Sequence, residues 1–311
     1  MIYTLTLNPA IDQVIQVPNF QLGEINKAVS EYEVIGGKGI NVAVMLQYLG
    51  YPTTALGFLG HDNKEMFEHY LAKQGVVACF HEVAGKTRIN MKIKSLEIKQ
   101  ETELNGIAFA ISDNDIAAIL TIIKTEVTKN DCLIMSGSLP QNCPFDLYQK
   151  ISTYCYENQI LFVVDATKDV LLSTLGAKPL LVKPNLDELN ELFGTDYKFT
   201  QKAEIVDLGQ KLQAQGAQNV LISSGKDGSI LITPTDVYFG NAATGQLINS
   251  VGAGDSMVAG FVGTYLATKD YQKALLTGIC AGSATAFSPG IAEPAVVESL
   301  KKQIKITVFK L

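Results

Sequence analysis

Two hydrophobic patterns alternate along most of the chain. Short, nearly continuous apolar runs at residues 2–7 and 53–59 are typical of buried strands. Residues 63–74 instead carry apolar side chains at helical spacing and end at Gly75, and residues 76–83 form another strand-like run. Because parallel strands need a crossover connection, this strand–helix–strand order predicts an α/β fold with a mostly parallel sheet.

The same alternation resumes at residue 112 and continues to residue 239. No internal repeat and no linker rich in proline and serine occurs, so we expect these strands to share one sheet with residues 2–7. The predicted helices are 112–127, 145–157, 168–175, 187–193 and 202–215. The predicted strands are 132–135, 160–164, 180–182 and 220–223, with a hairpin formed by 229–232 and 236–239.

Residues 11–35 and 85–105 depart from this pattern. They contain short runs in which polar and apolar residues alternate, such as DQVIQV from Asp12, and this is typical of strands with one exposed face. A second such strand is predicted at residues 27–32. A hairpin is predicted at residues 87–94 and 98–104, and we expect it to pair with these two earlier strands. The sequence therefore predicts an α/β domain built from 1–10, 36–84 and 106–311, and a small discontinuous sheet built from 11–35 and 85–105.

Composition narrows the class of protein. The 311 residues are 47% hydrophobic and 18% charged, which is enough apolar material for a full core. The net charge is −6 without any run of lysine or arginine, which argues against binding to nucleic acid or to a membrane surface. The five cysteines show no C-x-x-C spacing, so neither a disulfide framework nor a zinc site is indicated. No apolar run reaches membrane-spanning length and no leader pattern precedes the first strand, so we expect a cytoplasmic protein.

The stretch 251–260, VGAGDSMVAG, combines a tight glycine turn with the start of a helix. Such a turn directs unpaired backbone N–H groups at one point, where the helix dipole also favours an anion such as a phosphate. Asp255 would place a carboxylate base beside that phosphate, as phosphoryl transfer to a hydroxyl requires. The alternative is that Asp255 is only a helix N-cap. A second glycine turn, 36–39, leads into a helix that ends at Gly50.

Several better-known signatures are absent. Neither Gly225-Lys226 nor Lys38 is followed by the Ser or Thr of a Walker A loop. Met257 stands where a dinucleotide-binding fingerprint needs glycine. Ser138 lies in GSLP rather than in a G-x-S-x-G elbow, and the three histidines have no metal-ligand spacing.

Five motifs resemble, in order, the signatures of the ribokinase-like sugar kinases, the phosphofructokinase B family. They are GGKGINVA at 36–43, SGSLP at 136–140, VKPN at 182–185 with Glu188 three residues on, SSGKDG at 223–228, and VGAGDSMVAG. Within the family, TLNPAID, the lysine of GGKG, GFLGHDN and TRINMKI are most similar to 1-phosphofructokinases, with tagatose-6-phosphate kinases next. The resemblance implies a doubly wound sheet with helices on both faces, a small β-sheet lid, ATP as donor, Mg²⁺, a ketohexose phosphate as acceptor and a homodimer through the lid.

The resemblance also implies roles on the ATP side. Asp255 would be the base, and the N–H groups of Gly252, Ala253 and Gly254 would hold the transferring phosphoryl oxygens. Lys183 and Asn185 would approach the ATP phosphates, and Asn185 with Glu188 would bind Mg²⁺ through water. Ser223, Gly225 and Gly228 would contact the phosphate and ribose of the nucleotide. Gly278 and Gly282 would let the adenine ring lie against their helix. For Asn185 and Glu188 the alternative is a helix start, and for Gly278 and Gly282 it is helix packing.

On the acceptor side, the resemblance assigns sugar hydroxyls to Asp12, Gly37 and Asn41. Lys38 and Arg88 are the candidates for the phosphate already on the sugar, because lysine supplies a point charge and a guanidinium grips phosphate in a fork. Lys27 is a third candidate, and for each of these bases a solvated surface charge is the alternative.

The expected function is ATP-dependent phosphorylation of the 6-hydroxyl of fructose 1-phosphate. A tagatose-6-phosphate kinase stays open as a near alternative, and a non-catalytic sugar-phosphate sensor as a distant one.

Overall fold

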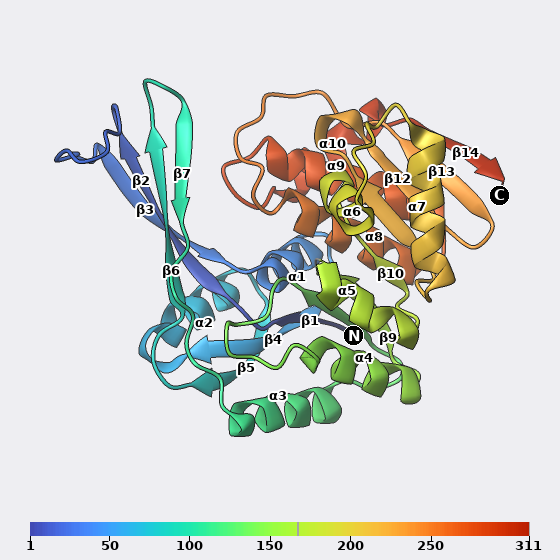
Figure 1. The fold of residues 1–311 in the computed structure, drawn as a ribbon, viewed down its shortest axis with the longest axis horizontal. Coiled ribbons are helices and arrows are strands. Elements are labelled where there is room, and N and C mark those ends of the chain that lie inside the picture. The colour runs from blue at the N-terminus through green and yellow to red at the C-terminus, as the bar shows by residue number, and fades with distance from the viewer. Residues whose placement is uncertain (167, 311) are drawn as a thin grey trace.

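The computed structural model describes residues 1–166 and 168–310. In these residues a ten-stranded sheet has the order β14-β13-β12-β11-β10-β9-β8-β1-β4-β5 (Figure 1). Its strands are β1 (Ile2–Thr6), β4 (Thr53–Gly60), β5 (Val77–Val83), β8 (Cys132–Ser136), β9 (Leu161–Asp165), β10 (Leu181–Val182), β11 (Val220–Ser223), β12 (Ser229–Ile232), β13 (Asp236–Gly240) and β14 (Ile306–Lys310). The seven strands β5, β4, β1, β8, β9, β10 and β11, in their order across the sheet, pair in parallel. β12, β13 and β14 follow β11 and pair antiparallel.

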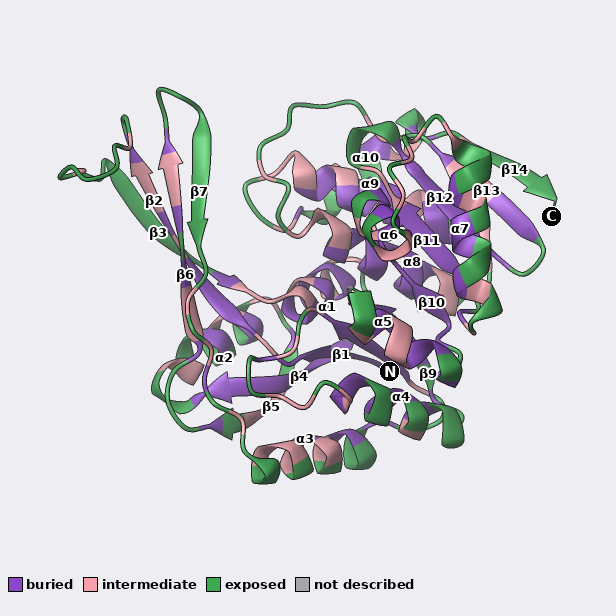
Figure 2. Ribbon diagram, viewed as in Figure 1, coloured by how far each residue is buried: buried purple, intermediate pink, exposed green. Residues whose placement is uncertain are grey.

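Helices cover both faces of this sheet. They are α1 (Lys38–Tyr48), α2 (Lys64–Lys73), α3 (Asp113–Glu126), α4 (Leu147–Glu157), α5 (Lys168–Thr174), α6 (Leu186–Phe193), α7 (Lys202–Ala214), α8 (Ala253–Thr268), α9 (Tyr271–Ala286) and α10 (Pro294–Leu300). Alternate residues of the central strands enter opposite cores: Leu133 belongs to the core that includes residues of α3 to α7, and Ile134 to the core that includes residues of α1, α8 and α9. A strand buried on both faces is apolar throughout, which explains the continuous runs (Figure 2). The predicted α/β class is confirmed.

A separate four-stranded sheet projects from one end of the molecule, in the order β3-β2-β6-β7 (Figure 1). Its strands are β2 (Ala10–Val17), β3 (Ser30–Gly36), β6 (Arg88–Ser95) and β7 (Gln100–Leu104). β2 pairs in parallel with β6 although 70 residues separate their ends, so the small sheet is discontinuous in sequence. Lys27 was predicted to lie on a strand of this sheet. It lies instead in the exposed connection between β2 and β3, because β3 begins only at Ser30.

The pattern gave no strand or helix boundaries beyond residue 260. In the structure, α8 runs on to Thr268, α9 packs against it, and α10 and β14 follow. Ten consecutive residues of α8, from Asp255 to Thr264, are buried, so this helix has no polar face and gives no amphipathic signal. β14 is a short edge strand with mostly exposed side chains. None of the helices in the described part of the chain is both long and apolar enough to cross a membrane.

Candidate active site

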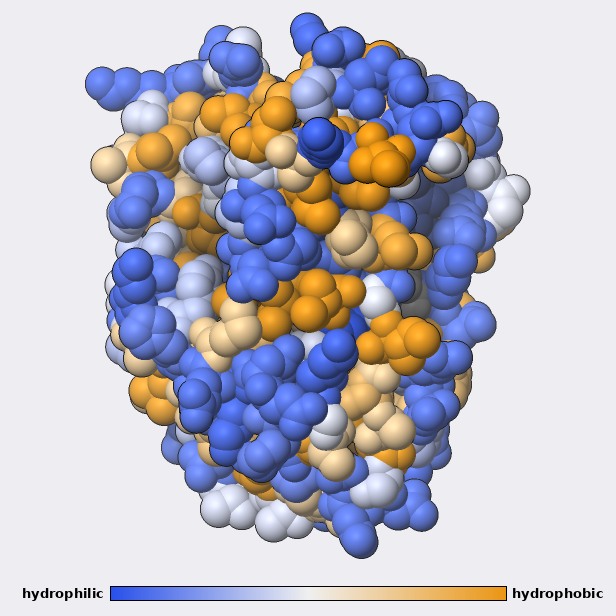
Figure 3. All heavy atoms as spheres, turned by 90° about the vertical axis from the view of Figure 1, so that its left-hand side faces the viewer, coloured by the Kyte–Doolittle hydropathy of each residue, from blue (hydrophilic) through white to orange (hydrophobic). Residues whose placement is uncertain are grey.

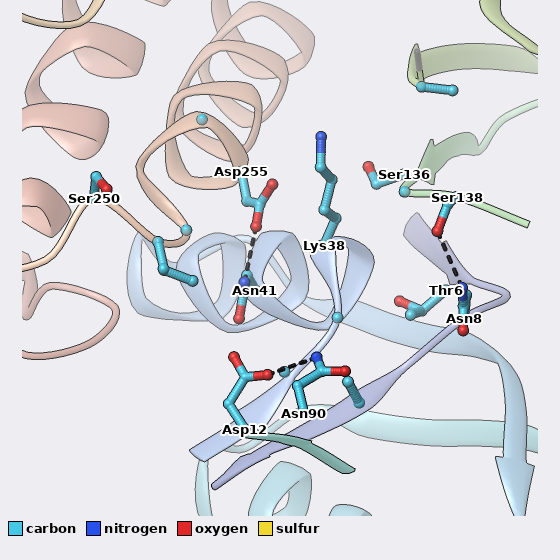
Figure 4. Close-up of a pocket in the computed structure, with 18 of the residues that line it drawn as sticks. Thr6, Asn8, Asp12, Lys38, Asn41, Asn90, Ser136, Ser138, Ser250 and Asp255 are labelled. Carbon is cyan, nitrogen blue, oxygen red and sulfur yellow. Dashed lines mark hydrogen bonds between the residues drawn. The ribbon is translucent and has the colours of Figure 1, made fainter. Parts of the chain in front are cut away.

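A cavity of about 500 Å³ lies at the carboxyl ends of the central strands, where the small sheet meets the large one (Figure 4). This is the position at which open α/β sheets bind ligands. Its walls come from the ends of β1, β8, β10 and β11, from the starts of α1, α6 and α8, and from the small sheet. The predicted site residues that line it are Asp12, Gly37, Lys38, Asn41, Arg88, Lys183, Asn185, Glu188, Ser223, Gly252, Gly254 and Asp255.

Asp255 lies in the first turn of α8 and is only 5% exposed. The helix N-cap is Gly252, whose φ of 80° suits glycine, and no side chain caps this helix end. The Asp255 carboxylate instead accepts a hydrogen bond from Asn41 Nδ2 on α1, at 2.8 Å (Figure 4). The structure therefore gives no support to the N-cap alternative.

Burial is the main cause that raises the pKa of Asp255, to about 6, and the nearby Asp165 carboxylate raises it further. Lys38, the Asn41 hydrogen bond and Lys183 act in the opposite direction. A carboxyl group with a pKa near neutrality is suited to accept a proton and later release it.

Asp165 was not singled out from the sequence, where it directly follows the predicted strand 160–164. It is buried at the end of β9, with Lys183 Nζ 3.3 Å from Oδ1 and Lys38 Nζ 3.5 Å from Oδ2. Burial alone would raise the pKa of Asp165, but the two ammonium groups outweigh it and hold the pKa below its ordinary value. Asp165, in turn, is the main cause that raises the pKa of Lys38. One carboxylate thus holds two charged lysines at the edge of the cavity.

Lys183 also lies against the glycine turn. A Cβ atom added to Gly254 would come 3.4 Å from Lys183 Nζ, so this ammonium group and the amino end of α8 face the same space. The N–H groups of Gly252 and Gly254 have no backbone acceptor among the described residues, whereas Ala253 N donates to Ser250 O at 3.3 Å. A fixed cation beside free N–H groups forms an anion-binding site.

Asn185 and Glu188 form a capping box at the start of α6. Asn185 Oδ1 accepts from Glu188 N at 2.7 Å, and Glu188 Oε2 accepts from Asn185 N at 2.8 Å. The helix-start alternative is therefore present in the structure, and both side chains also line the cavity. In the described residues, no group of three or more His, Cys, Asp or Glu side chains is arranged to hold a metal ion.

The small sheet supplies the opposite wall. Asp12 on β2 accepts from Asn90 Nδ2 at 2.8 Å and pairs with Lys92 Nζ at 3.2 Å. Arg88 on β6 is half-buried, and its guanidinium donates to the carbonyl oxygens of Pro9 and Asn8 at 3.4 and 3.5 Å. Burial lowers the pKa of Arg88 and the Asp12 carboxylate opposes that shift. Neither Asn90 nor Lys92 was predicted to take part, although both stand in the TRINMKI stretch.

Five further polar residues of the cavity were missed from the sequence: Thr6, Asn8, Ser136, Ser138 and Ser250. Asn8 donates to Ser138 Oγ at 3.1 Å, which joins the ends of β1 and β8 (Figure 4). The hydroxyls of Thr6 and Ser136 are buried and have no partner in the described part of the chain. A buried hydroxyl without a partner beside a cavity calls for an explanation, such as a bound water or ligand.

A second cavity, of about 640 Å³, adjoins the first, and Ser223, Ser250 and Gly254 line both. Gly225, Gly228, Ala253 and Gly282 line the second, together with apolar side chains such as Met257, Leu247 and Phe287. Gly278 lies elsewhere: a Cβ there would come 2.9 Å from Met257 O, so this glycine permits α8 and α9 to pack closely. The packing alternative is the one that the structure favours for Gly278. Lys27 lines neither cavity.

The fold and the site together define a class. An anion site at a helix start, beside a buried carboxylate and between a polar and a mostly apolar cavity, is suited to phosphoryl transfer between two ligands. Residues 5–297 match the pfkB family of carbohydrate kinases. The chain belongs to this family, and it is an ATP-dependent sugar kinase.

Two curated relatives cover the chain almost completely. A 1-phosphofructokinase of Bacillus subtilis is 39% identical over 307 residues, which is 99% of both chains. A D-tagatose-1-phosphate kinase of Bacillus licheniformis is 34% identical over 307 residues, again 99% of both. The structure of ribokinase from Thermotoga maritima matches with a TM-score of 0.78 at 18% identity, over 97% of this chain and 99% of that one, and this likeness concerns the fold alone.

Proposed function

We propose that the chain transfers the γ-phosphoryl group of ATP to O6 of fructose 1-phosphate and so forms fructose 1,6-bisphosphate and ADP. The observation that carries this proposal is the place of Asp255, which lies buried beside the glycine turn where the two cavities meet. The relatives named 1-phosphofructokinase support the choice of sugar.

The chemical step requires a base and a fixed anion site. The carboxylate of Asp255 accepts the proton of the 6-hydroxyl as O6 bonds to the γ-phosphorus and the bond to the β-γ bridging oxygen breaks. The free N–H groups of Gly252 and Gly254 stabilise the charge on the transferring oxygens, and that of Ala253 joins them only if it leaves Ser250 O. Ser223, Gly225, Gly228 and Gly282 hold the nucleotide in the second cavity.

The two candidate phosphate-binding cations lie in different halves of the site. Figure 4 shows the Lys38 side chain extending past Asp255 and Ser136, away from Asp12 and Asn90. The charges that raise the pKa of Lys38 are Asp165, Asp255 and Glu188, whereas Arg88 is affected by Asp12. We therefore assign Arg88 to the phosphate already on the sugar and Lys38, with Lys183, to the transferring phosphoryl group and ATP phosphates. Asp12, Asn41 and the backbone at Gly37 hold the sugar hydroxyls.

Mg²⁺ fits the donor set near Asn185 and Glu188. Glu188 uses Oε2 for the capping box, which leaves Oε1 to face metal-bound water, and oxygen is the ligand type that Mg²⁺ prefers. When bound, the ion neutralises charge on the phosphates. In the Glu188→Gln variant, the Mg²⁺ concentration for half-maximal rate should rise while the KM for the sugar phosphate stays constant. An unchanged Mg²⁺ titration would remove Glu188 from this role.

The sugar isomer is tested by initial rates. The relative named D-tagatose-1-phosphate kinase makes tagatose 1-phosphate a second candidate acceptor. Tagatose 6-phosphate, the near alternative that the sequence left open, is a third. Fructose 1-phosphate should give the highest kcat/KM of a panel that also holds tagatose 1-phosphate, tagatose 6-phosphate and fructose 6-phosphate. A higher value for another sugar would replace the acceptor, and no turnover of any would favour a sensor.

We further propose a homodimer formed through the small sheet. Large apolar side chains are exposed on the small sheet and on the loops that connect its strands: Leu22, Ile25, Tyr32, Val34 and Leu104. Figure 3, which views the molecule from this side, shows apolar groups among the polar surface. Sedimentation equilibrium should give twice the chain mass, and Ile25→Asp should shift it toward the monomer.

A further inference from the structure

Lys92 is a charged side chain inside the small sheet that lines neither cavity. It is in β6, and its side chain is only 11% exposed. A buried ammonium group is destabilising unless opposite charges surround it. Burial would lower the pKa of Lys92, but Asp12, Glu103 and Glu101 together raise it, so the group stays charged.

The pairing of strands places Lys92 in a row of charges across three strands. Lys92 lies opposite Val14 of β2 and opposite Glu103 of β7, and Asp12 is diagonal to it. Its Nζ atom is 3.2 Å from Asp12 Oδ2 and 3.5 Å from Glu103 Oε1. Asn90, which faces Asp12 directly, donates to the other carboxylate oxygen, Oδ1.

Both oxygens of Asp12 are thus held from the β6 side. Arg88 lies in the same region, but its guanidinium donates to the carbonyl oxygens of Asn8 and Pro9. A carboxylate oxygen accepts at two lone pairs, so each oxygen of Asp12 retains one for a sugar hydroxyl. Lys92 is therefore the ammonium group that holds Asp12 Oδ2 and, with Asn90 at Oδ1, keeps the carboxylate in one orientation.

We propose that Lys92 is a positioning residue for the acceptor sugar, acting through Asp12 without touching the substrate. The inference rests on the proposed function, since it takes Asp12 to bind sugar hydroxyls. Without Lys92, the Asp12 side chain is held at one oxygen only, so its carboxylate is no longer fixed in one orientation and the sugar phosphate binds less tightly. ATP binding and the chemical step at Asp255 lie in the other half of the site.

The chain offers a matched control in the next pair along the same strands. Lys94 lies opposite Glu101 and pairs with it at 3.3 Å, on the same face of β6 and β7 as Lys92 and Glu103. Lys94 has no contact with Asp12, and its side chain is 30% exposed. A lysine that served the small sheet alone would behave like Lys94.

The test compares Lys92→Met, Lys92→Arg and Lys94→Met with the wild type by steady-state kinetics. We expect Lys92→Met to raise the KM for fructose 1-phosphate about tenfold or more, because an Asp12 carboxylate that is no longer held in place loses its charge-assisted hydrogen bond to the sugar. The KM for ATP and kcat should change little, Lys92→Arg should recover most of the loss, and Lys94→Met should leave both KM values unchanged. Equal effects of Lys92→Met and Lys94→Met, or an unchanged KM in Lys92→Met, would overturn the proposal.

A double variant covers the case in which Lys92→Met fails to fold because it leaves Asp12 buried without its cation. Asp12→Asn with Lys92→Met removes both charges and should fold. If Lys92 acts through Asp12, the double variant and Asp12→Asn alone should have the same KM for the sugar phosphate. A further increase in the double variant would show that Lys92 acts by another route. Failure of the proposed function would look different, because the wild type itself would then not turn over fructose 1-phosphate.

Discussion

Different interactions hold the two walls of the active-site cavity in place. The wall formed by the large sheet carries Asp255, Lys38 and Lys183, and the buried Asp165 pairs with both lysines. The backbone positions of these residues are fixed by strand ends and helix starts beside two apolar cores. The wall formed by the small sheet carries Asp12, Asn90 and Arg88, which are held by hydrogen bonds and ion pairs across strands whose outer surfaces are exposed.

The difference indicates that the large-sheet wall positions its side chains precisely, whereas the small-sheet wall can adapt. On the large-sheet wall, two carboxylates and two lysines lie close together, so Asp165, Lys38 and Lys183 all shift the pKa of Asp255. On the small-sheet wall, Asn90 and Lys92 hold Asp12, and Arg88 donates to backbone carbonyl oxygens. We therefore expect substitutions on the large-sheet wall to change kcat, and those on the small-sheet wall to change the KM for the sugar phosphate.

The largest effect is expected for Asp255→Asn. The amide keeps the shape of the side chain and can still contact Asn41, but it cannot accept the proton of the attacking hydroxyl. We expect kcat to fall by about 10² to 10⁴, while binding of both substrates changes little. Single-turnover rates and isothermal titration would check this. Turnover within a few-fold of wild type would exclude Asp255 as the base.

Lys38→Met should come next. If the ammonium group acts on the transferring phosphoryl group, its loss should lower kcat by about 10², the usual effect of removing one preorganised donor. The KM for the sugar phosphate should change much less. The opposite result, a large rise in that KM at constant kcat, would return Lys38 to the sugar phosphate, as the sequence suggested.

Arg88→Lys tests the small-sheet wall. The variant keeps the charge but loses the two-pronged geometry, so the KM for fructose 1-phosphate should rise by about tenfold while that for ATP stays constant. Unphosphorylated fructose, a poor substrate for the wild type, serves as the control, and its kcat/KM should hardly move. Equal losses on both sugars would mean that Arg88 acts on the sugar ring or on the small sheet itself.

The sequence predicted the large sheet well because its central strands are apolar on both faces and helices with clear spacing separate them. It predicted the glycine turns and Asp255 because backbone geometry and charge coincide within ten residues there. Asp165 escaped notice because its role depends on Lys38 and Lys183, which are 127 and 18 positions away in the chain. Lys92 escaped for a similar reason, since only the pairing of β2 with β6 brings it to Asp12.

The smallest effect is expected in the dependence of rate on pH, and it tests the coupling within the large-sheet wall. Asp255 must be ionised to act as the base, and burial raises its pKa to about 6, so kcat/KM should fall as the pH drops through about 6. The phosphate of the substrate also titrates near pH 6, so the wild-type profile alone does not assign the group.

Lys38→Met separates the two titrations. Lys38 lowers the pKa of Asp255. Without this ammonium group, the acidic limb of the pH–rate profile, where kcat/KM falls with falling pH, should move to higher pH although the substrate is unchanged. Arg88→Lys, which alters the other wall, should leave the limb where it is. A limb that stays fixed in Lys38→Met would belong to the substrate or to another group, and the charges on the large-sheet wall would then not be coupled through Asp255.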